Sequence, residues 1–115
     1  LKTKKANSVA VRRLKNVKKL MRDNRVNEFY DETLKAVWGY MSDKLNIPLS
    51  RLSKDNVSSE LERRGCNEEL VAELLELLNE CEFARYAPGD PTATMDKIYR
   101  MAEAVISKME NSIKR

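Results

Sequence analysis

The segment DPTATMDKIYRMAEAVISKMENSI, residues 90–113, decides the fold class of this chain. Its apolar residues recur every three or four positions, which places them along one side of an α-helix. Either Asp90 or Thr92 can cap the start of this helix. The pattern predicts a long helix with one buried side, formed by Met95, Ile98, Tyr99, Ala102, Val105, Ile106, Met109 and Ile113.

Upstream of this segment, the same spacing predicts two more helices. One covers residues 67–86, with Asn67 as its cap and acidic residues in its first turn, where the helix dipole favours them. A shorter one covers residues 54–64, with Ser53 as its cap and Gly65 as the left-handed residue after its end. The apolar stripe of the longer helix is Leu70, Val71, Leu74, Leu75, Leu78 and Cys81.

A helix over residues 27–45 is predicted to be the central one, because its apolar residues cover more than one side. Asn27 can cap it, and Pro48 follows its end. Gly39 is expected to permit a close helix crossing. The apolar set is Phe29, Tyr30, Leu34, Ala36, Val37, Trp38, Tyr40, Met41 and Leu45.

A first helix over residues 4–22, followed by a turn at residues 23–25, completes the bundle. No alternating apolar pattern indicates strands. We therefore predict an all-α, irregular bundle of about five helices in a single domain. Residues 1–25 form a basic, juxtamembrane-like first helix that packs on the domain, and residues 26–115 form the helical body.

Charge is divided unevenly between these two parts. Residues 1–25 contain ten basic side chains and one acidic side chain, which gives +9. The remaining residues contain twelve basic and seventeen acidic side chains, which gives −5, so that the whole chain carries +4. Such an asymmetry indicates that the first segment meets something negative.

Three partners fit the basic first helix. Anionic lipid is favoured, because cytoplasmic flanks of membrane helices are rich in Lys and Arg. Nucleic acid is less favoured, because the chain shows no second basic patch, aromatic platform or helix-turn-helix. Alternatively, the cations pair with acids of the helix over residues 67–86. The expected lipid-facing residues are Lys4, Lys5, Arg12, Lys15, Lys18 and Lys19.

No residue pattern indicates catalysis, a metal site or a cofactor. The chain has no His, and Cys66 and Cys81 are fifteen positions apart, which favours two half-buried free thiols over a disulfide or a zinc site. Carboxylates recur at helical spacing opposite the leucine stripe, which is typical of a solvated face. These carboxylates are Glu69, Glu73, Glu76 and Glu80. An enzyme would require a missing domain to supply the other half of its site.

Two groups of residues are candidates for contacts with a partner. Trp38 and Tyr40 are more typical of core than of a ligand platform. Arg85, beside Tyr86 near a helix end, can stabilise terminal carbonyls or anchor a partner. These alternatives stay open at this point.

The chain begins at Leu1 rather than Met, so we expect it to be part of a longer or processed protein. No apolar run approaches the roughly 20 residues of a membrane helix, and no signal peptide is visible. We therefore expect the fragment itself to be soluble.

The chain resembles the cytoplasmic C-terminal tail of BatD-type proteins from bacterial aerotolerance operons. Three stretches carry the resemblance: KKANSVAVRRLKNVKKLM at residues 4–21, NEFYDETLKAVWGYMSDKLNI at 27–47, and LLNECEFARYAP at 77–88. They match as a helical pattern with scattered aromatic and charged positions, and they contain no catalytic signature. The candidate interaction residues in these stretches are Trp38, Tyr40, Asp43, Lys44, Arg85 and Tyr86.

The resemblance implies a non-catalytic interaction domain of a membrane-anchored protein with a role in oxidative stress. In such proteins, β-rich secreted domains precede one membrane helix, and the helical tail lies at the cytoplasmic face of the inner membrane. The same operons encode a MoxR-type AAA+ ATPase and proteins with von Willebrand A or tetratricopeptide domains, which are the implied partners. A soluble nucleic-acid-binding domain is the alternative.

Overall fold

The last helix, α6, packs against four other helices. The computed structural model describes residues 2–113, with side chains from residue 8 onward, and α6 runs over Pro91–Ser112. Asp90 caps it by accepting a hydrogen bond from the Thr92 amide at 3.0 Å. The structure therefore confirms the long helix and selects Asp90 as its cap. Fully buried members of its apolar stripe are Met95, Ile98, Ala102, Ile106 and Met109.

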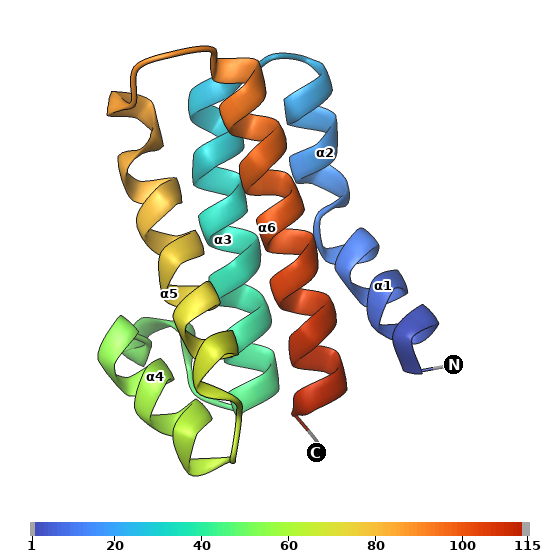
Figure 1. The fold of residues 1–115 in the computed structure, drawn as a ribbon, viewed down its shortest axis with the longest axis vertical. Coiled ribbons are helices and arrows are strands. Elements are labelled where there is room, and N and C mark those ends of the chain that lie inside the picture. The colour runs from blue at the N-terminus through green and yellow to red at the C-terminus, as the bar shows by residue number, and fades with distance from the viewer. Residues whose placement is uncertain (1, 114–115) are drawn as a thin grey trace.

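The neighbours of α6 lie on different sides of it (Figure 1). On one side lie α1 (Lys2–Arg13) and α2 (Lys15–Arg22), and on the other lies α5 (Glu68–Phe83). The fourth neighbour is α3 (Val26–Leu45), which also packs on α2 and α5. Because each of these helices buries its apolar side against α3 or α6, they share one core.

The elements η1 (Leu49–Arg51) and α4 (Lys54–Arg63) close one end of the bundle (Figure 1). The 3-10 helix η1 leads to α4, which packs on α5. Ser53 caps α4 through a reciprocal capping box with Asn56. Gly65 follows with a φ of +82°, as predicted for the residue after a helix end. A second 3-10 helix, η2 (Ala84–Tyr86), follows α5.

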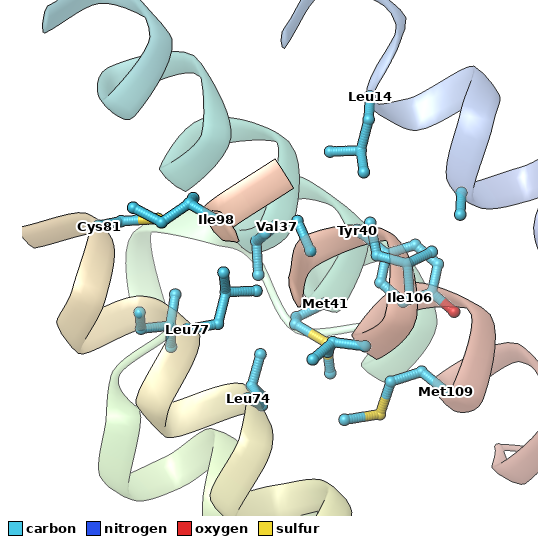
Figure 2. Packing of buried hydrophobic residues seen from close by; sticks show 14 of the residues in the cluster. Leu14, Val37, Tyr40, Met41, Leu74, Leu77, Cys81, Ile98, Ile106 and Met109 are labelled. Atoms are coloured by element: carbon cyan, nitrogen blue, oxygen red, sulfur yellow. The ribbon is translucent and has the colours of Figure 1, made fainter. Parts of the chain in front are cut away.

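The core lies between α3, α5 and α6. Figure 2 shows side chains from these three helices converging, among them Val37, Leu77 and Ile106. Leu14, at the junction of α1 and α2, is also fully buried. The first helical segment is therefore an integral part of the domain.

The all-α fold is confirmed, but the count of helices differs from the expected five. Residues 2–113 form six α-helices and two 3-10 helices. The first predicted helix is divided at Leu14, whose φ of −102° and ψ of 13° depart from helical values. This bend allows α1 to follow α6 while α2 packs mainly on α3. Neither Gly nor Pro marks the bend in the sequence.

Two local predictions are wrong. Asn27 does not cap α3, which begins one residue earlier, because Asn24 adopts a φ of +57° and closes the turn after α2. Gly39 does not permit a close helix crossing, since a Cβ built there would meet no atom within 4 Å. Its role is therefore not one of interhelical packing.

The core predicts the effect of truncating Leu77. Leu77→Ala should reduce the free energy of unfolding by about 3 kcal/mol, because it leaves a cavity among fully buried neighbours. Leu49→Ala is the matched control, since Leu49 is 54% exposed. This control should change stability by less than about 0.5 kcal/mol. Equal effects of the two substitutions on urea unfolding would contradict the described packing.

Candidate functional site

The outward side of α1 and α2 carries a row of cations, which we call the basic face. It consists of Arg12, Lys15, Lys18, Lys19 and Arg22, all of them exposed. Among the side chains from residue 8 to residue 113, none of these five takes part in an ion pair. Their positive charge is therefore available to an external partner.

The opposite side of the same segment fixes the orientation of the basic face. Ala10, Leu14 and Val17 are buried in the core, so the cations on the other side must point away from the domain. Val11 is 51% exposed beside Arg12 and adds an apolar group to this surface. The expected lipid-facing side chains of Lys4 and Lys5 lie outside the described part of the chain.

Among the side chains of residues 8–113, the acids of α5 do not pair with the basic face. Lys108 of α6 binds Glu73 at 2.9 Å, and Lys97 of α6 binds Glu80 at 3.2 Å. Because α5 lies on the opposite side of α6 from α1 and α2, its carboxylates meet α6 lysines instead (Figure 1). For the five cations of the basic face, the alternative in which they pair with α5 acids is therefore wrong. Glu69 and Glu76 have no ion pair within residues 8–113.

Three of the candidate residues meet in a polar group that we call the Tyr40 cluster: Arg13, Tyr40, Asp43, Lys44 and Glu110. The Tyr40 hydroxyl donates to Glu110 Oε2 at 2.5 Å, and Lys44 Nζ lies 2.5 Å from the same oxygen. Arg13 pairs with Asp43, and its guanidinium carbon lies 5.6 Å from the Tyr40 ring centroid. The cluster thus joins the end of α1 to α3 and α6.

The Tyr40 cluster is a structural joint rather than an open binding site. Tyr40 is 1% exposed, and the side chains of Lys44 and Glu110 are 16% and 11% exposed. A partner could reach only Arg13 and Asp43, which line a shallow hollow of about 400 Å³ at the end of α3. Arg13 and Glu110 could not be identified from the sequence, because contacts between residues so far apart in the chain leave no local signal.

The remaining candidates lie elsewhere. Trp38 is partly buried and packs against the core. Arg85 binds Asp31 at 2.9 Å. This ion pair was not part of either interpretation of Arg85 from the sequence, as a group that stabilises terminal carbonyls or as an anchor for a partner. Tyr86 is 77% exposed. Asp31 and Tyr40 are nine positions apart on α3, or about 13 Å, so Arg85 and Tyr86 do not join the Tyr40 cluster.

Both cysteines are free thiols, as predicted, but they are more deeply buried than expected. Cys81 is 0% exposed and Cys66 is 9% exposed. Burial raises the pKa of both thiols, and that of Cys81 rises to about 12, with a further contribution from Glu80 and Glu82. Since the thiolate is the reactive form, these residues are unsuited to nucleophilic chemistry at neutral pH.

The described residues contain neither a metal-binding cluster nor a membrane-spanning helix. Between residues 8 and 113, no three His, Cys, Asp or Glu side chains are placed to hold a metal ion. Within residues 2–113, no helix has the length and apolar character needed to span a bilayer. The basic face and Phe83, which is exposed at the end of α5, are both surface features that a partner could contact.

Comparisons of the chain with protein-family models, with curated proteins and with solved structures found no match.

The Tyr40 cluster predicts a stability effect at Glu110. Glu110→Gln should lower the free energy of unfolding by about 2 kcal/mol, because it leaves the largely buried Lys44 ammonium without its carboxylate. Glu62→Gln on the exposed side of α4 is the control and should change stability by less than about 0.5 kcal/mol. Urea titration measures both, and equal values would argue against a stabilising cluster.

Cys81 predicts a loss of stability in alkali. The unfolded thiol ionises near its ordinary pKa of 9.0, whereas the folded thiol keeps its proton until about 12. The contribution of the Cys81 thiol to the free energy of unfolding is therefore complete below pH 9.0 and is lost as the pH rises above that value. Between about pH 9 and about pH 10, the free energy of unfolding should fall by about 1 kcal/mol. Cys81→Ala should reduce this slope, and an unchanged slope would contradict the assignment.

Proposed function

We propose that this chain is a non-catalytic interaction domain that lies against an anionic membrane surface through its basic face. The supporting observation is the row of five exposed cations on α1 and α2 that have no ion pair within residues 8–113. At about 1 kcal/mol for each Lys or Arg near an anionic leaflet, five such residues contribute about 5 kcal/mol to membrane attachment.

The resemblance to BatD-type tail domains supports the same proposal from a different direction. In those proteins the helical tail follows a membrane helix and lies at the cytoplasmic face of the inner membrane. We accordingly assign this domain to a membrane-anchored protein of an aerotolerance or oxidative-stress system. Its candidate protein partners are a MoxR-type AAA+ ATPase and proteins with von Willebrand A or tetratricopeptide domains.

Lipid fits the basic face better than nucleic acid does. Val11 adds an exposed apolar group beside the cations, and interfacial helices use such groups to enter the headgroup region. The five cationic positions include no aromatic side chain between them on which a base could stack. A phosphate backbone would thus gain charge contacts but no stacking.

Vesicle binding tests this proposal. Cosedimentation with phosphatidylcholine vesicles containing phosphatidylserine should show binding that is absent without the anionic lipid. Replacing Lys15, Lys18 and Lys19 together by Gln should weaken the partition coefficient by about 100-fold, from about 1 kcal/mol for each lost cation.

The matched control removes the same charge from α6. Neutralising Lys97, Arg100 and Lys108 to Gln should leave vesicle binding nearly unchanged, because these residues lie away from the basic face. Equal losses in the two triple variants would contradict the proposal. Tighter binding to duplex DNA than to the vesicles would assign the basic face to nucleic acid instead. In that case the logarithm of the binding constant should fall against the logarithm of the salt concentration with a slope of about −4.5.

A further inference from the structure

The outer side of α5 combines exposed apolar side chains with carboxylates. Phe83 is 64% exposed, Leu75 is partly buried and Ala72 is exposed. Together with Glu76, Asn79 and Glu80, these residues line one shallow hollow. A large aromatic side chain left in solvent near the end of a helix has no role in the core of this domain.

A second hollow adjoins the first and shares Glu76 with it. It holds about 260 Å³ in the groove between α5 and α6, with Met101, Ala104 and Val105 as its apolar lining. The ion pairs Glu73–Lys108 and Glu80–Lys97 span this groove on either side of Glu76. Glu76 is exposed and has no ion pair within residues 8–113. We call the two hollows together the α5 surface.

We propose that the α5 surface docks a cationic amphipathic helix of a partner protein. A Lys or Arg of that helix would place its aliphatic stem on Met101 and Ala104 and its charge on Glu76. Apolar residues one turn away would cover Leu75 and Phe83. This inference rests on the proposed function as an interaction domain and adds the chemistry of the protein partner.

Charge and shape both favour this occupant. Within residues 8–113, Glu73 and Glu80 are paired with Lys108 and Lys97, so Glu76 supplies the unpaired negative charge of the surface. This charge attracts a cationic segment and repels an acidic one. Two packed helices leave a groove between their ridges, and a third helix fits such a groove better than an extended strand does. Residues 2–113 form helices and no strands, so a strand of a partner would find no sheet edge there to pair with.

The position of the α5 surface is compatible with attachment to a membrane. The helix α5 lies on the opposite side of α6 from α1 and α2, which carry the basic face (Figure 1). A domain held to lipid through α1 and α2 therefore presents α5 to the aqueous phase. Docking at α5 and contact with lipid do not compete for the same residues.

The test uses this chain and a fluorescently labelled synthetic peptide. The peptide consists of Lys and Leu spaced so that, as a helix, it has one cationic side and one apolar side. Anisotropy titration should detect binding, and a peptide with Glu in place of Lys should not bind. Phe83→Ala and Glu76→Lys should each weaken binding by about tenfold, because each removes one of the two anchors.

Matched controls separate a defined site from general attraction. Leu49→Ala removes an apolar side chain that is 54% exposed on η1. Glu62→Lys makes the same charge change on the exposed side of α4. Each control should alter the dissociation constant by less than about twofold. Losses as large as those at Phe83 and Glu76 would overturn the proposal, as would absence of binding or a Phe83-dependent dimer of this chain.

The two proposals can fail independently. Phe83→Ala and Glu76→Lys should retain binding to phosphatidylserine vesicles, because the basic face is intact in both. Loss of peptide binding with vesicle binding retained confirms the separate role of the α5 surface. Peptide binding by a chain that never binds vesicles would support docking and remove only the membrane contact.

Discussion

The structure depends on the burial of α6. Its apolar residues cover an arc too wide for one neighbour to shield, from Tyr99 through Ala102 to Val105. Burial of such an arc requires helices on more than one side, since exposed apolar area is unfavourable by about 25 cal/mol per Å². The helices α1 and α2 cover one side, α5 covers another, and α3 packs on α2, α5 and α6. The remaining features of the domain follow from this arrangement.

As one consequence, the basic residues of the first segment and the acidic residues of α5 lie on different sides of the folded domain. The basic segment and the acidic α5 both pack on α6, but from opposite sides, so their charges do not neutralise each other. The Tyr40 cluster holds the end of α1 in place through Arg13 and Asp43, while Ala10 and Leu14 anchor it by burial. The domain therefore has a cationic surface on α1 and α2, and a partly apolar surface on α5 where Glu76 has no ion pair within residues 8–113.

Local chemistry made much of the fold predictable. Ser53, Asn67 and Asp90 cap helices where their side chains can accept a backbone N–H. Ser53 and Asn67 were identified from their positions before an apolar stripe, and Asp90 was one of two alternatives for its helix. The bend at Leu14 was not predictable, because it arises from packing on two different helices and not from a helix-breaking residue.

The candidate sites were predictable only where they depend on a single helix. The basic face could be found from the spacing of Lys15, Lys18 and Lys19 alone. The Tyr40 cluster could not be assembled, since Tyr40 and Glu110 are seventy positions apart and meet only after folding. Phe83 was missed because its position outside the leucine stripe becomes informative only when its exposure is known.

The central claim is that the domain lies on lipid with α1 and α2 facing the membrane and α5 facing water. Nitroxide labels at Val11→Cys and, in a second variant, Ala72→Cys test it directly, because both sites are exposed and the native thiols are buried. On phosphatidylserine vesicles, the label at 11 should gain collisions with lipid-soluble oxygen, while the label at 72 stays accessible to a water-soluble relaxation agent. Equal shielding of the two labels, or full water access at 11, would contradict the account.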